Sequence, residues 1–213
     1  LCGEGEEGLA PLTLERPLPL LSLFYKPLLA HQAGLLRRHG VREIGVALPR
    51  LSRMVEDAMG DGEELGVRFT WLPCRGAGEL ELLAACAAFL GEEAALVLPG
   101  GGLGDLDLSA LLAFHQVHRS AATLALAPPA GRLRARQGEP GVGILRGAAR
   151  AGAAGEGTLA GRLSALLDRG EALYGVVPEG QWRELTGGEA YLDALADALS
   201  GKLRLRWDAP RTA

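Results

Sequence analysis

Apolar residues recur along the chain in two alternating patterns, one with the period of a helix and one typical of a strand. Stripes with apolar residues three and four positions apart predict helices. Short, nearly continuous apolar runs predict buried strands. The predicted helices span 27–39, 51–59, 79–90, 106–118, 159–167 and 189–199, and the predicted strands span 43–48, 66–72, 94–98, 121–127, 172–177 and, as an edge strand, 202–207.

The alternation of helices and strands predicts an α/β fold. Helices and strands at this spacing are typical of βαβ units, so we expect a mostly parallel sheet with helices on both faces. Residues 128–157 differ, because they are rich in Gly, Ala, Pro and Arg and contain only one short apolar run, at 142–145. Too few elements flank this stretch to build a second core. We therefore predict a single domain over residues 1–213 with a loose insertion at 128–157.

Composition narrows the classes of function. The formal net charge is −4 and the arginines are dispersed, which argues against a nucleic-acid partner because phosphate binding needs a basic face. No apolar run approaches the roughly 18 residues of a membrane span, and no leader pattern is present, so a cytoplasmic protein is expected. The three cysteines lack metal-ligand spacing and are predicted to be small buried hydrophobes. The chain opens on Leu1 rather than Met, which leaves open whether residues are missing upstream.

Several segments in a fixed order point to a known family. They are Pro-Leu-Thr-Leu-Glu-Arg-Pro at 11–17, Lys-Pro-Leu-Leu-Ala-His-Gln at 26–32, and the runs at 35–44, 60–67, 89–93 and 105–115, with a weaker match at 182–191. Together they resemble the sugar-1-phosphate nucleotidyltransferases, or NDP-sugar pyrophosphorylases, such as the mannose-1-phosphate guanylyltransferases. The resemblance implies a Rossmann-like nucleotidyltransferase fold. It also implies a reaction in which a sugar phosphate attacks the α-phosphate of an NTP and pyrophosphate leaves.

The resemblance is weakest where that chemistry needs charge. The family's loop Gly-Gly-x-Gly-Thr-Arg-Leu-x-Pro-Leu-Thr aligns with a segment that starts at Gly3 and has Gly8 at the arginine position. Of the family's three glycines the aligned loop keeps only Gly3, while Gly5 and Gly8 stand at other positions and glutamates stand at 4, 6 and 7. Like charges a few ångströms from a triphosphate cost on the order of 1 to 4 kcal/mol. The lysine of the family's Pro-Lys-Pro motif is replaced by Leu18.

The remaining functional positions of the family are also altered. Its Asn-Gly-Asp motif, whose Asp binds the metal, aligns with Pro-Gly-Gly at 99–101, and its Leu-Gly-Thr-Ala-Gly motif keeps only Gly78. Gly141 stands at the position of the Asn in Asn-Ala-Gly, and Glu184 is a weak remnant of the second metal carboxylate. The resemblance thus leaves a degenerate nucleotide-binding set and predicts no catalytic residue, no metal ligand beyond this remnant and no cofactor. The set is Gly3, Gly5, Gly8, Gly78, Gly100 and Gly101.

Several of the residues with possible functional roles also have simpler structural interpretations. The glycines at 100–102 suit a plain turn from strand to helix, since no Lys and Ser/Thr follow them as in a Walker loop. His115 and His118 are predicted to face solvent, because no ligand partner is spaced to form a metal site with them. The glutamates at 4, 6 and 7 suit an exposed acidic turn. The arginines at 132, 134 and 136 suit a solvated loop.

The selective loss of charge from a retained scaffold predicts a pseudoenzyme. We expect a noncatalytic, nucleotidyltransferase-like protein that acts through protein contacts as a regulatory or scaffold subunit, with an active paralogue or another enzyme as partner, in a homo- or hetero-oligomer. One alternative is a divergent active enzyme that makes an NDP-sugar, which would require Mg²⁺. Another is a nucleotide sensor that binds without turnover.

Overall fold

Helices and short strands alternate along the chain. The structure, a computed structural model, describes residues 7–48, 52–74, 78–91, 93–126, 141–147 and 158–205. The α-helices are α1 (Leu28–Arg38), α2 (Ser52–Met59), α3 (Glu79–Leu90), α4 (Leu108–His118), α6 (Leu159–Asp168) and α7 (Gly188–Leu199). The strands are β1 (Ser22–Leu23), β2 (Lys26–Pro27), β3 (Glu43–Leu48), β4 (Arg68–Pro73), β5 (Ala95–Val97), β6 (Gly102–Gly104), β7 (Ala122–Ala125), β8 (Gly143–Leu145), β9 (Leu173–Val176) and β10 (Trp182–Glu184).

The strands form small sheets of mixed direction. β3 and β4 are parallel, and β7 and β9 are parallel. β8 runs antiparallel to both of its neighbours, in a sheet of order β5-β8-β7-β9, and β6 and β10 form a separate antiparallel pair. The prediction of a mostly parallel sheet is therefore wrong. The apolar pattern reports that a strand is buried but not in which direction it runs.

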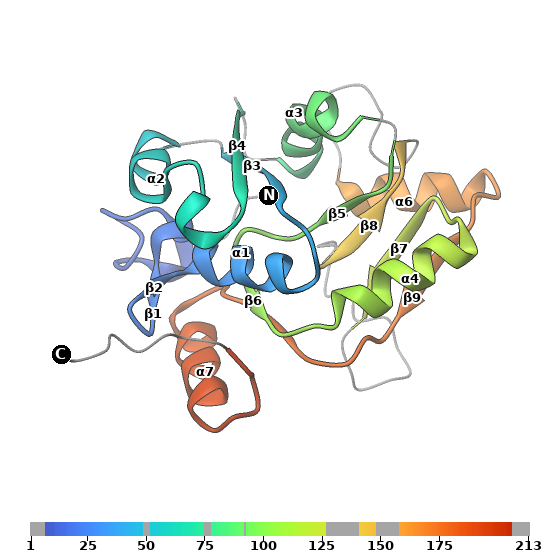
Figure 1. The fold of residues 1–213 in the computed structure, drawn as a ribbon. Coiled ribbons are helices and arrows are strands. Elements are labelled where there is room, and N and C mark those ends of the chain that lie inside the picture. Colours follow the sequence, from blue (N-terminus) through green and yellow to red (C-terminus); the bar gives the residue numbers. More distant parts are fainter. Residues whose placement is uncertain are drawn as a thin grey trace.

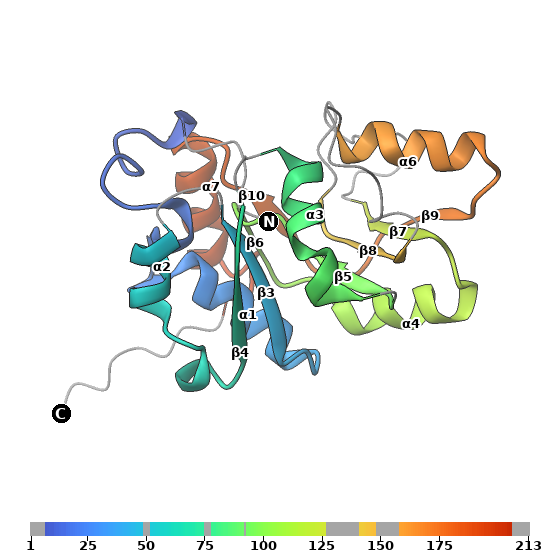
Figure 2. The same cartoon turned by 90° about the horizontal axis from the view of Figure 1, so that it is seen from above.

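Helices cover both faces of the four-stranded sheet, as predicted. Successive side chains of a strand point to opposite faces, and β8 shows the two sides. Ile144 packs in one core cluster with Leu111 of α4 and with α1, whereas Leu145 packs in another with Leu83 of α3 and Leu163 of α6. Figure 2 shows α6 and α4 on opposite sides of these strands. Figure 1 shows β3 and β4 beside α1 and α2, with α7 below them.

The stretch predicted to be a loose insertion contains a central strand. Residues 127–140 and 148–157 lie outside the described residues, but residues 141–147 between them are described. All three residues of β8 are buried, and the strand lies between β5 and β7. The sequence shows an apolar run at 142–145, but the run is too short, among Gly and Ala residues, to predict a strand.

The predicted edge strand at 202–207 does not form in its described part, residues 202–205. Leu203 is buried and Leu205 is partly buried in the cluster that also holds Ala194 and Ala198 of α7. The N–H group of Arg204 donates to Asp105 Oδ2 over 2.9 Å. The alternation of polar and apolar residues here therefore reflects packing against α7 rather than strand pairing. Residues 206 and 207 lie outside the described part of the chain.

Two further predictions can be compared with the structure. Cys86 is buried, which confirms the prediction for that residue, and burial raises the pKa of its thiol. Cys74 is half-buried, and Cys2 lies outside the described residues. Within the described ranges, no helix is long and apolar enough to cross a membrane.

Candidate functional site

A turn between β5 and β6 carries two of the predicted site glycines, Gly100 and Gly101. Gly102 donates its backbone N–H to Pro99 O over 3.2 Å, which closes the turn. Gln32 of α1 is buried, and its Nε2 lies 2.9 Å from Pro99 O, 3.3 Å from Gly100 O and 2.6 Å from Gly102 O. The turn is thus fixed by α1. It is a plain turn, as the simpler interpretation holds, but it leads into strand β6 before α4 begins.

Leu18 packs directly on this turn. It begins a single 3₁₀ turn, Leu18–Leu20, and is only 4% exposed. A Cβ atom placed on Gly101 would lie 3.1 Å from Leu18 Cδ2. The positions that the resemblance assigns to a phosphate-binding lysine and a metal-binding aspartate are therefore neighbours in space. In this chain the two positions make an apolar contact.

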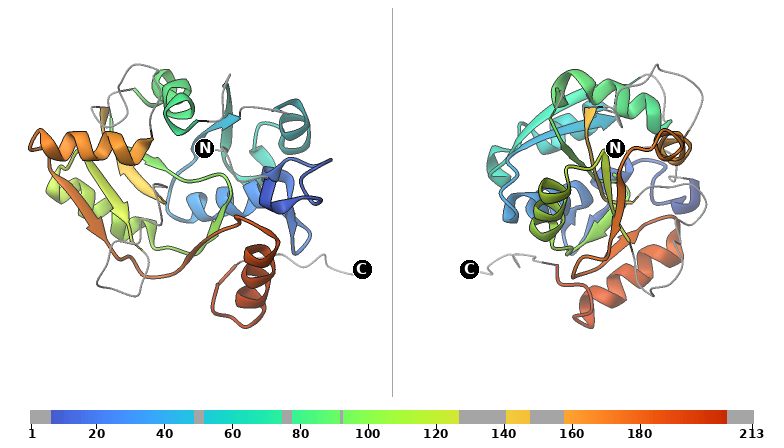
Figure 3. Two further views of the ribbon diagram at one scale, coloured as in Figure 1. Left: turned by 180° about the vertical axis from the view of Figure 1, so that it is seen from behind. Right: turned by 90° about the vertical axis from the view of Figure 1, so that its right-hand side faces the viewer.

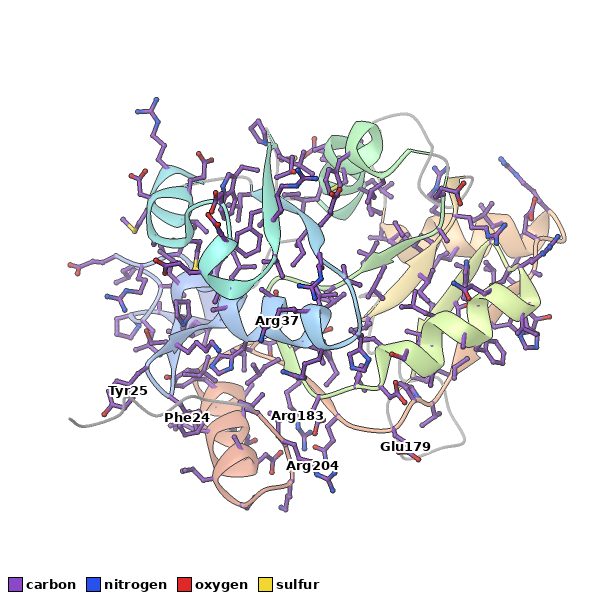
Figure 4. All side chains as sticks on the ribbon, viewed as in Figure 1. Phe24, Tyr25, Arg37, Glu179, Arg183 and Arg204 are labelled. Carbon is purple, nitrogen blue, oxygen red and sulfur yellow. The ribbon has the colours of Figure 1, made fainter. Side chains whose placement is uncertain are left out.

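Glu184 lies beside the same turn. It is paired with Gly102 across the β6–β10 ladder, and the next residue, Leu185, donates its N–H to Gly101 O over 2.8 Å. Glu184 Oε1 would lie 3.8 Å from a Cβ atom on Gly141, just before β8. The preceding residue, Arg183, lies near α7 (Figure 4), where its Nη2 is 2.6 Å from Asp197 Oδ2.

Gly8, near the start of the described residues, packs against the backbone that follows Leu185. A Cβ atom on Gly8 would overlap Thr186 O and press on Gly187, so only glycine permits this close approach of two backbones. Gly3 and Gly5 lie outside the described residues. The structure places Gly78 differently, since it is exposed before α3 and a Cβ atom there would meet only Glu81 Oε2, at 3.9 Å.

We call the set Gly8, Leu18, Gly101, Gly141 and Glu184 the turn cluster. Its only ionisable side chain is Glu184, and none of its members is cationic. Among all described residues, no group of three or more His, Cys, Asp or Glu side chains could hold a metal ion. Mg²⁺ bound between protein and nucleotide is usually held by one or two carboxylates together with substrate phosphates, and nothing cationic in the cluster would hold those phosphates. The residues described here therefore do not fit the metal that the family resemblance implies.

Asp105, a carboxylate near β10, is already occupied by backbone donors. Its Oδ1 accepts the N–H of Gln181 over 2.7 Å, and its Oδ2 accepts the N–H of Arg204 over 2.9 Å. Asp105 thereby ties the segment after α7 to the start of β10. We assign it a structural role rather than a place in the turn cluster.

A second polar group lies within the core, around His115. His115 is 1% exposed, so the prediction that it faces solvent is wrong, whereas His118 is exposed as predicted. His115 Nδ1 lies 2.9 Å from Thr123 Oγ1 and 3.2 Å from Ser120 Oγ, and Arg146 Nε donates to His115 Nε2 over 3.4 Å. Burial, and secondarily Arg146, lower the pKa of His115.

Sequence reasoning missed two of these features. The positions 108, 111 and 115 share one helix face, which is the signal that could have placed His115 in the core. Gln32 gave no comparable signal, because an amide on a helix can face either water or a buried turn. Only the packing of α1 under the turn reveals its three carbonyl contacts.

Comparison with known proteins agrees with the segments found in the sequence. Residues 2–135 match the family described as nucleotidyl transferase. The chain is 38% identical over 111 residues to an N-acetylmuramate alpha-1-phosphate uridylyltransferase of Neisseria meningitidis, covering 51% of this chain and 47% of that protein. It is 30% identical over 130 residues to a mannose-1-phosphate guanylyltransferase of Mycobacterium tuberculosis, covering 59% and 35%. The chain thus matches less than half the length of either relative.

Solved structures share the fold. A Bacillus anthracis protein described as a glucose-1-phosphate thymidylyltransferase superposes with a TM-score of 0.78 at 19% identity, over 92% of both chains. An apo UDP-glucose pyrophosphorylase superposes with a TM-score of 0.73 at 13% identity, over 95% of this chain and 98% of that one. At these identities the likeness concerns the fold alone. The family match spans well over half of the sequence, and the chain therefore belongs to the nucleotidyl transferase family.

Proposed function

We propose that this protein is a catalytically degenerate sugar-1-phosphate nucleotidyl transferase that acts through protein contacts, as a regulatory or scaffold subunit. The family membership and the fold support the nucleotidyl transferase part of the proposal. The composition of the turn cluster supports the loss of chemistry. The proposed partner is an active nucleotidyl transferase or another enzyme that handles the same nucleotide sugars.

The contact between Leu18 and Gly101 carries the proposal. Transfer of a nucleotidyl group is largely a matter of holding and neutralising phosphate charge with cations and metal-bound carboxylates. The family resemblance assigns a lysine and an aspartate to these positions, where this chain has an isobutyl group packed on a glycine. Such a surface can neither pair with a phosphate nor ligate Mg²⁺, and Glu184 alone does not replace both functions.

The size of the rate loss expected from the missing arginine favours an inactive protein over an enzyme that is only modestly slowed. An arginine that stabilises the transferring phosphoryl group is typically worth a factor of about 10³ to 10⁵, or roughly 4 to 7 kcal/mol of barrier. The family's loop arginine is aligned with Gly8 in this chain. Losses within one site are not additive, but this change alone would bring an ordinary enzyme close to inactivity.

A pyrophosphate-release assay tests the proposal directly. The protein would be incubated with Mg²⁺, each of GTP, dTTP and UTP, and a set of hexose-1-phosphates. We expect no pyrophosphate above the protein-free background. Turnover above about 1 s⁻¹, within the range of ordinary enzymes, would show a divergent active transferase instead.

Thermal-shift titration separates a silent scaffold from a nucleotide sensor. A ligand present at about 100 times its Kd adds near 2.7 kcal/mol to the stability of the folded state. We expect no shift of Tm with any of the three nucleotides and Mg²⁺, whereas a saturable shift without turnover would replace the proposal with the sensor function. The double variant Leu18→Lys/Gly101→Asp, which returns both charges to the turn cluster, is the matched test for gained nucleotide binding. The same double variant with Glu184→Gln is its control.

The contact function needs its own measurement. The purified chain would be added to an active nucleotidyl transferase from the same organism, and the molecular mass of the mixture and kcat/KM of the enzyme would be followed. We expect a stable complex and a changed kcat/KM. Unchanged mass and rate with every such enzyme of the organism would contradict the regulatory role.

A further inference from the structure

Strand β9 lies at one edge of the four-stranded sheet. The order of this sheet is β5-β8-β7-β9, and among the described residues β9 pairs only with β7. Figure 3 shows β9 from behind and from the side, at the end of the molecule away from α2. A strand at the edge of a sheet carries a row of backbone groups that can pair with another strand. The outer side of β9 is therefore a place where a second chain can add to the sheet.

The ladder with β7 shows which backbone groups of β9 are directed outward. Leu126 donates its N–H to Val176 O, so Val176 faces β7. The N–H and C=O groups of alternate residues in a strand point to opposite sides, and Tyr174 therefore faces β7 as well. The N–H and C=O groups of Leu173 and Gly175 consequently point away from the sheet.

Apolar side chains lie beside this edge on the α4 face of the sheet. Tyr174 is exposed, and its ring meets the Phe114 ring of α4 edge to face, with ring centroids 5.5 Å apart. Phe114 also stacks on the His118 ring, at a centroid distance of 3.9 Å. Val117 is 78% exposed and is a neighbour of Phe114 on the helix surface, since the two are three residues apart. The edge thus combines outward backbone groups with the exposed aromatic and apolar side chains that are typical of the centre of an interface.

The charges that flank β9 decide the register in which a second copy of this chain fits. Glu171 precedes the strand, Glu179 follows it, and both are exposed. If two antiparallel β9 strands were related by a two-fold axis through Gly175, Glu171 of each copy would lie opposite Glu179 of the other, and like charges in opposed positions are destabilising. With the axis at Tyr174, Glu171 lies opposite Val177 instead. The two Tyr174 side chains then form an aromatic cross-strand pair, which is stabilising.

We propose that two copies of this chain associate through β9, with the strands antiparallel and the two-fold axis at Tyr174. Leu173 of each copy exchanges backbone hydrogen bonds with Gly175 of the other, because the groups of these two residues point outward. The two sheets become one continuous sheet, and the side chains beside α4 in both copies meet on one face of it. The interface uses the same patch on both copies, as a two-fold dimer requires.

The molar mass in solution tests the association. The purified chain would be studied by sedimentation equilibrium at several protein concentrations, and we expect an equilibrium between monomer and dimer. Tyr174→Lys replaces the aromatic pair on the axis by two like charges and should raise the Kd of the dimer at least about tenfold. Leu199→Lys is the matched control, at a position 72% exposed on α7 and away from β9 (Figure 2). It should leave the Kd unchanged, and circular dichroism checks that both variants are folded.

A disulfide bond across the axis tests the register. Opposed residues of a non-hydrogen-bonded antiparallel pair have Cα atoms about 4.5 Å apart, which is within the range that a disulfide spans. Tyr174→Cys should therefore give a disulfide-linked dimer when oxidised glutathione is added, because position 174 lies opposite itself. Val177→Cys is the control, since Val177 is also exposed but lies opposite Glu171 in the proposed register, and it should give no linked dimer. The wild-type chain, treated in the same way, gives the background from its own cysteines.

Three results would overturn the proposal. One is a monomer at every protein concentration. Another is a dimer whose Kd is unchanged by Tyr174→Lys, because a different surface would then form it. The third is a linked dimer that forms as readily through Val177→Cys as through Tyr174→Cys. None of these measurements depends on nucleotide turnover or on a partner enzyme, so the proposed function can fail while this inference holds.

Discussion

At the scale of single residues, burial and hydrogen bonds restrict the protonation of His115. Arg146 Nε donates to Nε2, so Nε2 accepts a hydrogen bond and Nδ1 carries the proton that is donated to Thr123 Oγ1. This assignment of the proton follows from the hydrogen-bond network. A second proton on Nε2 would face the Arg146 guanidinium inside the core. Burial and Arg146 accordingly hold the pKa of His115 below its ordinary value of 6.5.

The lowered pKa of His115 predicts a loss of stability on acidification. The folded state binds fewer protons than the unfolded state, so the stability that neutral His115 contributes is complete above about pH 6.5 and is lost as pH falls below it. We expect the free energy of unfolding, measured with urea, to be lower at pH 5.5 than at pH 7.0. His31, whose pKa burial also lowers, contributes in the same direction.

The variant His115→Gln isolates this effect. The free energy of unfolding of this variant should decrease less between pH 7.0 and pH 5.5 than that of the wild type, although it is lower than that of the wild type at pH 7.0. Gln116→Ala, at an exposed position of the same helix that carries no ionisable group, is the control and should keep the wild-type slope. If His115→Gln keeps the wild-type slope as well, the buried imidazole is not the group that titrates.

At the scale of elements, the β6–β10 pair places Glu184 beside the turn cluster, and glycines make this pairing possible. A Cβ atom on Gly102 would overlap ring atoms of Trp182, and one on Gly104 would meet both Gln181 O and the Trp182 ring. The Trp182 indole thus packs against two glycines of β6. This close approach is what brings Glu184 opposite Gly102.

The variant Gly102→Ala is expected to destabilise the protein by about 1 to 3 kcal/mol, because an added methyl group in a filled space forces side chains and backbone to shift. Gly188→Ala is the matched control, since nothing lies within 4 Å of a Cβ atom at that position on α7. It should be neutral or should stabilise by up to about 1 kcal/mol. Thermal unfolding monitored by circular dichroism measures both, and equal Tm values would contradict the packing described for β6.

At the scale of the whole molecule, β8 connects the helical layers on the two sides of the sheet. Its residues face α4 on one side and α3 and α6 on the other. A strand in this position is part of the core, even though residues on both sides of it in the sequence are rich in Gly and Ala.

Truncation of Leu145 tests the place of β8 in the core. Leu145 is 1% exposed, and Leu145→Ala should cost about 2 to 5 kcal/mol in urea unfolding, as buried leucines do. Leu167→Ala, at a position 56% exposed on α6, is the control and should change stability by no more than about 0.5 kcal/mol. A similar small change for both variants would mean that β8 is dispensable for folding.

Most helices and several strands could be predicted from the sequence, because apolar periodicity follows directly from which face of an element is buried. The helix predicted at 79–90 is α3, and the strand predicted at 43–48 is β3. The direction of β8 and the existence of β6 and β10 could not be predicted. Short strands contain too few residues to show a period, and glycines give no apolar signal.

The candidate site, like the fold, could be predicted from the sequence only in part. The resemblance singled out Gly8, Leu18, Gly101 and Glu184 one by one from widely separated segments, which required only a comparison of sequence motifs. That Leu18 lies against Gly101, and that Glu184 is the single ionisable group of the cluster, depends on how β10 and the N-terminal loop pack on the turn after β5.

The sequence by itself therefore determined the family, the succession of helices and strands, and which charged residues of the family this chain lacks. These properties are local, since each is expressed in the spacing and type of neighbouring residues. Only the tertiary structure decided the strand directions, the burial of His115 and the three carbonyl contacts of Gln32. Each of these depends on contacts between residues far apart in the chain, whose geometry no local pattern encodes.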